Sequence, residues 1–154
     1  MAPPGGEHGA VQLRIGSALL VQGALLGFGE AATEVGIVLW RDPDRLVGAD
    51  VAFIAASRLP LRCSPEGYWE TIPDLVVEVR SKNDSVREVE QKVADYLKAG
   101  VKIVWVAEPE IRTVTIHRPD TPPKKEREGA ILTLPDIIPD FRLAVSDAFP
   151  KAST

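Results

Sequence analysis

The segment Asp74-Leu-Val-Val-Glu-Val-Arg80 decides the fold class that this sequence predicts. Its near-continuous apolar run is typical of a strand in the centre of a sheet that is covered on both faces. One charge, Glu78, interrupts the run, and a carboxylate in a buried strand is unfavourable unless a positive group satisfies it. Glu78 is therefore the first candidate functional residue.

Patterns typical of helices and strands extend from this segment in both directions. Apolar residues at helical spacing predict one amphipathic helix over 9–26 and a second between a capping pattern at Ser85 and a stop at Gly100. β-rich runs predict strands at 34–40, 50–55, 101–107, 111–117, 130–134 and 141–145. The remaining segments predict a turn at 41–44, a long connection at 58–73, a hairpin turn at 108–110 and a charged loop at 119–129. This order predicts an α/β fold, with helices flanking a mixed central sheet, in a single domain spanning residues 1–154.

The composition narrows the class of protein. With 154 residues, 45% hydrophobic and 26% charged, the chain is typical of one soluble globular domain. A net charge of −4 excludes a basic surface over the whole protein but leaves room for a local basic groove. One cysteine, Cys63, and two histidines exclude a disulfide framework and a thiolate-rich zinc site. Without a recognisable signal or membrane-spanning segment, we expect a cytoplasmic protein that does not bind a membrane.

Two acidic residues could form a metal site. Asp50 opens the predicted strand that precedes the one containing Glu78, so neighbouring strands could bring both carboxylates to one point at the end of the sheet. Carboxylate oxygens suit Mg²⁺ or Mn²⁺, which keep several waters and can activate one for attack on a phosphate. Two cations could assist: Arg80, two residues after Glu78, and Lys92, which the predicted helix places beside Tyr96 at the rim of its apolar stripe. The alternative interpretation is that Glu78 forms a structural ion pair with Arg80 or Lys92.

Four segments of the chain together resemble one known family. They are Pro-Asp-Leu-Val-Val-Glu-Val-Arg-Ser at 73–81, Lys-Val-Ala-Asp-Tyr at 92–96, Gly-Val-Lys-Ile-Val-Trp-Val at 100–106 and Phe-Arg-Leu-Ala-Val-Ser-Asp-Ala-Phe at 141–149. On these residues the chain resembles the Uma-two family, which is classed with the endonucleases of the PD-(D/E)xK superfamily. The resemblance covers nearly the whole sequence and implies a restriction-endonuclease-like fold.

The resemblance also implies roles for individual residues. It makes Asp50 the metal-binding aspartate, Glu78 the second acid and the backbone carbonyl of Val79 a further ligand. The lysine of the superfamily usually stands where this chain has Arg80, and in the Uma-two type Lys92 of the next helix takes its place. The implied activity is that of a Mg²⁺- or Mn²⁺-dependent endonuclease that hydrolyses nucleic acid, DNA in particular, and leaves a 5′-phosphate.

The amino terminus departs from the family pattern. The chain starts close to the segment Pro4-Gly-Gly-Glu-His8, so we expect the domain to lack the acidic hairpin with which relatives usually begin. His8 and Glu7 are accessory candidates, for phosphate or water and for the metal, although such residues often only cap a helix. Asp74 could approach the metal, but we favour a structural role at the entry to its strand. A sheet edge left open by the missing hairpin predicts a homodimer.

Two other function classes fit the same sequence. One is a catalytically inactive nuclease fold that binds nucleic acid, and the other is a homodimeric protein-interaction module. Trp69, in the long connection, is the one tryptophan that we consider for stacking on nucleic acid, since Trp40 and Trp105 lie in predicted strands. Lys124, Lys125 and Arg127 could contact phosphates, but a solvated loop is the favoured interpretation.

Overall fold

A computed structural model describes residues 5–151 as two packed sheets with two long helices. The elements are α1 (Gly6–Gln22), η1 (Ala24–Leu26), β1 (Gly29–Trp40), β2 (Arg45–Ala55), η2 (Ala56–Arg58), β3 (Leu75–Val79), α2 (Val86–Ala99), β4 (Ile103–Glu108), β5 (Thr113–Arg118), β6 (Thr121–Glu126), β7 (Ile131–Leu134), β8 (Ile138–Ala144) and η3 (Val145–Ala148). The main sheet has the order β1-β2-β3-β4-β5-β6, and β7 pairs with β8 in a second, small sheet. Among the named strands within residues 5–151, β3 and β4 run parallel and the other neighbours in the main sheet run antiparallel, which confirms the mixed sheet.

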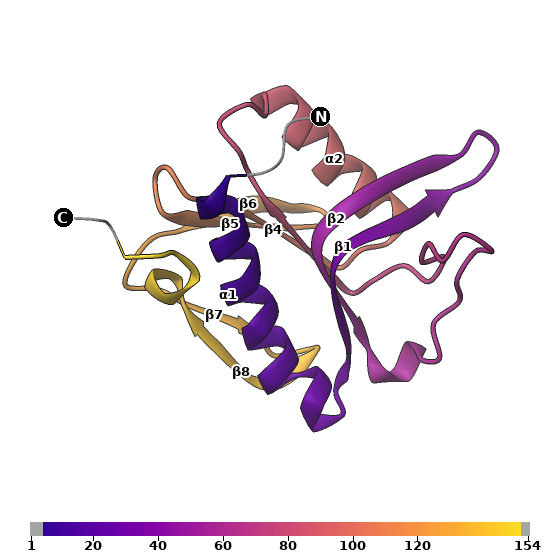
Figure 1. Cartoon of the computed structure of the whole chain (residues 1–154), viewed down its shortest axis with the longest axis horizontal. Helices are drawn as coiled ribbons and strands as arrows, with labels where there is room; N and C mark the ends of the chain where they lie inside the picture. Colours follow the sequence, from indigo (N-terminus) through magenta and orange to yellow (C-terminus); the bar gives the residue numbers. More distant parts are fainter. Residues whose placement is uncertain (1–4, 152–154) are drawn as a thin grey trace.

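β3 lies in the middle of the main sheet, and all five of its residues are buried. Its side chains alternate between two apolar clusters. Leu75, Val77 and Val79 belong to the cluster that contains α1 and the β7–β8 pair, and Val76 belongs to the cluster that contains α2. Figure 1 shows α1 and β8 next to each other and α2 on another side of the sheet. The apolar run of β3 thus has the burial on both faces that its sequence predicts.

The first predicted helix is two elements rather than one. α1 ends at Gln22, and the chain turns at Gly23 into the short η1. A Cβ atom at Gly23 would lie 2.7 Å from Ile138 Cδ1 and 2.9 Å from Phe53 Cε2, so this residue lets the chain pass close to the core. Leu25, which the helical pattern places on the buried stripe, is instead 69% exposed. The apolar spacing over 9–26 therefore predicts a helix that is longer than α1, because close packing at Gly23 interrupts the helix before the apolar spacing ends.

The second helix agrees with its prediction at both ends. The Ser85 side chain accepts a hydrogen bond from the Glu88 N–H at 3.1 Å, and Gly100 closes the helix with a φ of 110°. The hairpin between β4 and β5 is also present, with antiparallel pairing from Val104 with His117 to Glu108 with Thr113. Both features depend on local residues, which explains why the sequence predicts them well.

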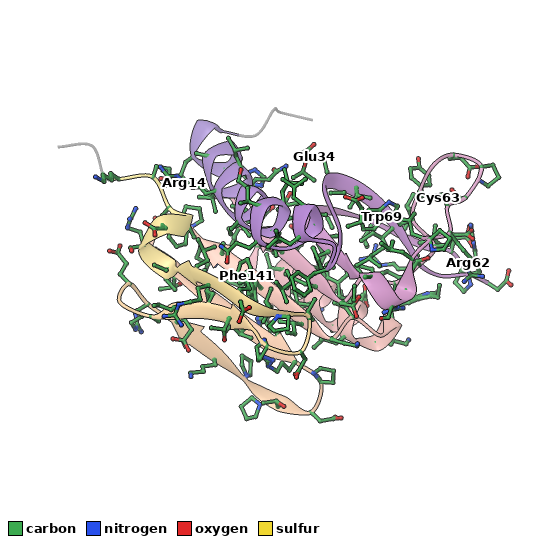
Figure 2. The ribbon with its side chains drawn as sticks, turned by 90° about the horizontal axis from the view of Figure 1, so that it is seen from below. Arg14, Glu34, Arg62, Cys63, Trp69 and Phe141 are labelled. Atoms are coloured by element: carbon green, nitrogen blue, oxygen red, sulfur yellow. The ribbon has the colours of Figure 1, made fainter. Side chains whose placement is uncertain are left out.

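The structure corrects the prediction for two groups of strands and for Trp69. β1 and β2 are longer than expected, so Asp50 lies inside β2 instead of opening it. The predicted charged loop at 119–129 contains β6, which carries Pro122 and Pro123 at the edge of the sheet, where prolines are tolerated because no partner needs their missing N–H groups. Trp69 is buried, and its backbone bonds to Gly36 and Val38 of β1, so it is not free to stack on a base. Figure 2 shows Trp69 among the packed side chains beside the β1–β2 strands.

One stretch of the described chain has the length and composition of a membrane-spanning helix, although the sequence analysis predicts none. It is Gly6–Leu26, with a mean hydropathy of 1.3 and 33% of the window buried. Core helices of soluble proteins and signal sequences near an N-terminus pass the same test. Val11, Ile15 and Leu19 of this stretch pack into the core cluster beneath α1.

Candidate active site

The antiparallel pairing of β2 and β3 brings the two predicted acids together. The ladder ends with Val51 opposite Val77, so the next residues along it are Asp50 and Glu78. Asp50 Oδ2 accepts a hydrogen bond from the N–H of Val79 at 2.7 Å, which fixes the aspartate against the end of β3. The two carboxylates thus lie beside each other near the end of β3, where β2 continues past Val79, the last residue of β3.

α2 supplies two polar groups to Glu78. Lys92 Nζ lies 2.7 Å from Glu78 Oε1, and the Tyr96 hydroxyl donates a hydrogen bond to the same oxygen at 2.6 Å. Lys92 Nζ also donates to the carbonyl of Gly48 at 3.1 Å, so its ammonium bridges β2 and β3. Lys92 and Tyr96 are four residues apart on one helix, and this spacing places them on the same side of α2.

Tyr96 contacts Glu78 although the sequence pattern indicates only that this tyrosine lies beside the apolar stripe of its helix. The signal was present: a tyrosine in a buried stripe needs a partner for its hydroxyl group. Tyr96 is fully buried, and Glu78 is that partner. The structure therefore adds a positioning residue to the predicted set.

Burial changes the protonation of both partners. It raises the pKa of Glu78 to about 7, with the Lys92 charge acting to lower it and the Asp50 charge acting to raise it further. Burial first and the Glu78 charge second raise the pKa of Tyr96. Tyr96 therefore remains a hydrogen-bond donor, while Glu78 can change its charge near neutral pH.

His8 reaches the acids from the first turn of α1. Its Nε2 atom lies 3.4 Å from Asp50 Oδ2, and its Nδ1 atom is buried and has no hydrogen-bond partner within residues 5–151. Glu7, the other accessory candidate at this end of α1, is exposed and lines a neighbouring cavity. The structure thus places His8, and not Glu7, against the acidic pair.

Arg80 and Asp74 lie away from the acidic pair. The Arg80 guanidinium points to Glu108 Oε1, with Nη1 at 3.4 Å, so Lys92 is the cation that contacts Glu78. Asp74 precedes β3 at its other end, about 13 Å from Glu78 along an extended strand. Its Oδ2 accepts from the Ala55 N–H at 2.7 Å and its Oδ1 lies 3.1 Å from Lys102 Nζ, which is the structural role that the sequence favours.

The acidic pair has the donor chemistry that a hard divalent cation requires. In the described part of the chain, the polar contacts of Asp50 fall on Oδ2 and those of Glu78 fall on Oε1, so each carboxylate keeps one oxygen for another ligand. No group of three or more His, Cys, Asp or Glu residues suited to a metal occurs within residues 5–151. Mg²⁺ needs only one or two protein carboxylates because it keeps several waters. The residues therefore fit Mg²⁺ or Mn²⁺ and do not fit an ion that demands a complete protein cage.

Comparison with known proteins identifies the family. The model of the Uma2 family, described as "Putative restriction endonuclease", matches residues 1–146. The chain belongs to the Uma2 family. The fold of this Uma2 chain is similar to the crystal structure of a "putative nuclease belonging to DUF820" from Anabaena variabilis, with a TM-score of 0.81 and 22% identity over 96% of this chain and 83% of that one. The search of curated proteins found no match.

These comparisons confirm the predicted family and the restriction-endonuclease-like fold, and they support a nuclease-type hydrolase in general terms. At 22% identity the structural neighbour bears on the fold alone. The roles of the individual residues and the need for a metal stay predictions, which are developed below.

Proposed function

We propose that this Uma2 protein is a metal-dependent endonuclease that hydrolyses phosphodiester bonds in nucleic acid, DNA in particular. The observation that carries the proposal is the convergence of Asp50, Glu78 and Lys92 at the end of the β2–β3 ladder. Two carboxylates beside a lysine combine metal-binding oxygens with a cation that can support attack on a phosphate. The family description gives independent support for a nuclease.

Under this proposal, a few residues have separate roles in metal binding, in positioning and in stabilising charge. Asp50, Glu78 and the carbonyl of Val79 would hold Mg²⁺ or Mn²⁺, which supplies an activated water and positive charge at the phosphoryl group. The Val79 N–H and His8 keep Asp50 in place, and Tyr96 holds the Glu78 carboxylate through Oε1. Lys92 would hold its positive charge near the attacking water and the phosphate oxygens, where negative charge develops during hydrolysis.

The same contacts also suit a protein without turnover. The Tyr96 hydroxyl and the Lys92 ammonium both contact the buried carboxylate of Glu78. These contacts are those of a structural ion pair, which is the alternative interpretation of the sequence. An inactive nuclease fold that binds nucleic acid is therefore the second candidate function. Activity and stability measurements on the same variants separate the two.

The test measures cleavage of labelled DNA, single-stranded and duplex, and of RNA, with Mg²⁺, with Mn²⁺ and with EDTA. We expect metal-dependent cleavage that Lys92→Ala reduces by roughly 100-fold or more, the effect of removing one electrostatic partner of the transition state. Lys98→Ala is the matched control, because it removes an exposed lysine of the same helix that lies over Trp40. Thermal unfolding of each variant shows whether a loss of activity reflects a loss of fold.

Two results would contradict the proposal. If the parent protein cleaves none of these substrates with either metal, the non-catalytic binding module is favoured. If Lys92→Ala cleaves as fast as the parent, Lys92 is not part of the site. A structural ion pair alone predicts instead that Lys92→Ala has no special effect on cleavage and lowers the free energy of unfolding by about 3–5 kcal/mol, since it removes the cation from a buried carboxylate and leaves only the Tyr96 hydroxyl.

A further inference from the structure

A cavity of about 600 Å³ adjoins the acidic pair. Three segments form it: the first turn of α1, the connection from β3 to α2 and the turn between β4 and β5. Figure 1 shows the amino-terminal end of α1 beside the connection that leads to α2. Two residues link the cavity to the acids, because His8 contacts Asp50 and Arg80 directly follows Val79, whose N–H holds Asp50. Asp50 and Glu78 do not line the cavity themselves, so a molecule bound there is separated from Asp50 by His8.

One part of the cavity lining favours a phosphate. Arg80 contributes a guanidinium whose two contacts, to Glu108 Oε1 at 3.4 Å and to the Asp84 carbonyl at 3.5 Å, are long and leave donors available. Lys82 is exposed and forms no ion pair within residues 5–151. Gly5 precedes α1 without a capping side chain, so N–H groups of the first turn are further donors. Arginine and lysine bind phosphate oxygens through charge-assisted hydrogen bonds.

Another part of the lining favours a base. Pro109 and Ile111 border the cavity from the β4–β5 turn, and Ile111 is 51% exposed although its side chain is wholly apolar. Apolar side chains beside cationic groups suit a base attached to a phosphate, because the base can bury one face against them. Three carboxylates, Glu7, Glu108 and Glu110, also line the cavity. Glu108 is paired with Arg80, and the charges of Glu7 and Glu110 restrict a bound phosphate to the segment that carries Arg80 and Lys82.

We propose that this cavity binds a single unpaired nucleotide of the substrate strand next to the bond that is cut. Its phosphate contacts Arg80 and Lys82, and its base lies against Pro109 and Ile111. The volume falls in the range of small-molecule pockets, about 300–1,000 Å³, which suits one nucleotide rather than a base pair. The protein therefore selects single-stranded or locally opened nucleic acid. This inference rests on the proposed function, because it takes the strand that enters the cavity to be the nuclease substrate.

Binding without cleavage tests the inference separately from the activity. The probe is a fluorescein-labelled 12-nucleotide DNA, single-stranded or annealed to its complement, titrated with the full chain in EDTA and followed by fluorescence anisotropy. We expect the single strand to bind at least about tenfold more tightly than the duplex, because burying one unpaired base against apolar side chains favours the single strand by this order. We expect Arg80→Ala and Ile111→Glu each to weaken single-strand binding by about tenfold, the effect of one charge-assisted hydrogen bond or of one apolar contact with the base.

Arg62→Ala is the matched control, since it removes an arginine from the connection between β2 and β3. Figure 2 shows Arg62 on the side of the molecule away from Arg14 of α1. The control should bind the single strand as the parent does. Equal affinity of the parent for single strand and duplex overturns the inference, as do Arg80→Ala and Ile111→Glu variants that fold and bind like Arg62→Ala. Selective single-strand binding by a protein that cuts nothing overturns only the nuclease proposal, and cleavage with no strand preference in binding overturns only this inference.

Discussion

Replacing Glu78 by glutamine should remove a pH dependence that this one residue gives to the stability of the fold. In the metal-free protein, burial raises the pKa of Glu78 from the ordinary 4.5 to about 7. A raised carboxyl pKa means that between these values the folded state binds more protons than the unfolded state. The free energy of unfolding therefore falls as the pH rises from 4.5 to about 7, and this loss is complete above pH 7.

The size of the effect follows from the two pKa values. Each pH unit between them corresponds to 1.36 kcal/mol, so the folded parent loses about 3 kcal/mol from Glu78 between about pH 4.5 and pH 8. Glutamine has nearly the same shape and keeps an oxygen that can accept from the hydroxyl of Tyr96 and from Lys92. The free energy of unfolding of Glu78→Gln should therefore rise by about 3 kcal/mol relative to that of the parent between about pH 4.5 and pH 8.

Urea unfolding of both proteins at several pH values between 4.5 and 8.5, in EDTA, measures the difference in the free energy of unfolding. Glu66→Gln, an exposed carboxyl group in the connection between β2 and β3, is a control for the loss of any one carboxylate. A difference between Glu78→Gln and the parent that stays constant over the whole range would refute the burial argument. It would mean that Glu78 is solvated well enough, or paired tightly enough with Lys92, to titrate near its ordinary pKa.

Three further predictions concern the metal, the assembly and the packing. Mn²⁺ at about 100 times its dissociation constant should raise the melting temperature of the parent by roughly 5–10 °C, and Asp50→Ala should abolish this shift; no shift in the parent would contradict a metal site. The chain should be a homodimer, since in the described residues the edge of β1 away from β2 has no strand neighbour and bonds only to Trp69, at Gly36 and Val38; a monomeric mass in light scattering at micromolar concentration would exclude it. Gly23→Ala should lower the free energy of unfolding by about 1–3 kcal/mol because the new methyl group meets Ile138, whereas Gly9→Ala, with open space around it, should be neutral or stabilising; equal melting temperatures of the two variants would refute this packing argument.

The parts of the molecule that the sequence predicts best are those that local chemistry decides. The apolar composition of β3 predicts that it is buried, and Ser85 and Gly100 predict where α2 begins and ends. The adjacency of Asp50 and Glu78 also follows from the order of the strands, because consecutive strands usually pair. The sequence therefore predicts the sheet centre, the second helix and the meeting of the two acids.

The parts that it predicts poorly depend on long-range contacts. The segment Thr121–Glu126 has the prolines and charges of a loop, and only the neighbouring β5 makes it an edge strand. Trp69 lies in a polar connection, yet backbone hydrogen bonds to β1 carry it into the core. A helix break at Gly23 likewise depends on Phe53 and Ile138, which are distant in sequence.

The position of the cation beside Glu78 follows from the way β3 ends. Glu78 and Arg80 are two residues apart and would share a face if the strand continued, but β3 stops at Val79. Arg80 then turns to Glu108, while Glu78 faces the helix that covers its side of the sheet. A cation that is to reach Glu78 must therefore come from α2, and Lys92 does so one turn before Tyr96. Arg80, in long contacts with Glu108 and the Asp84 carbonyl, lines the adjacent cavity. Under the proposed function the two positive charges would serve different parts of one bound strand, Lys92 the bond that is cut and Arg80 the neighbouring nucleotide.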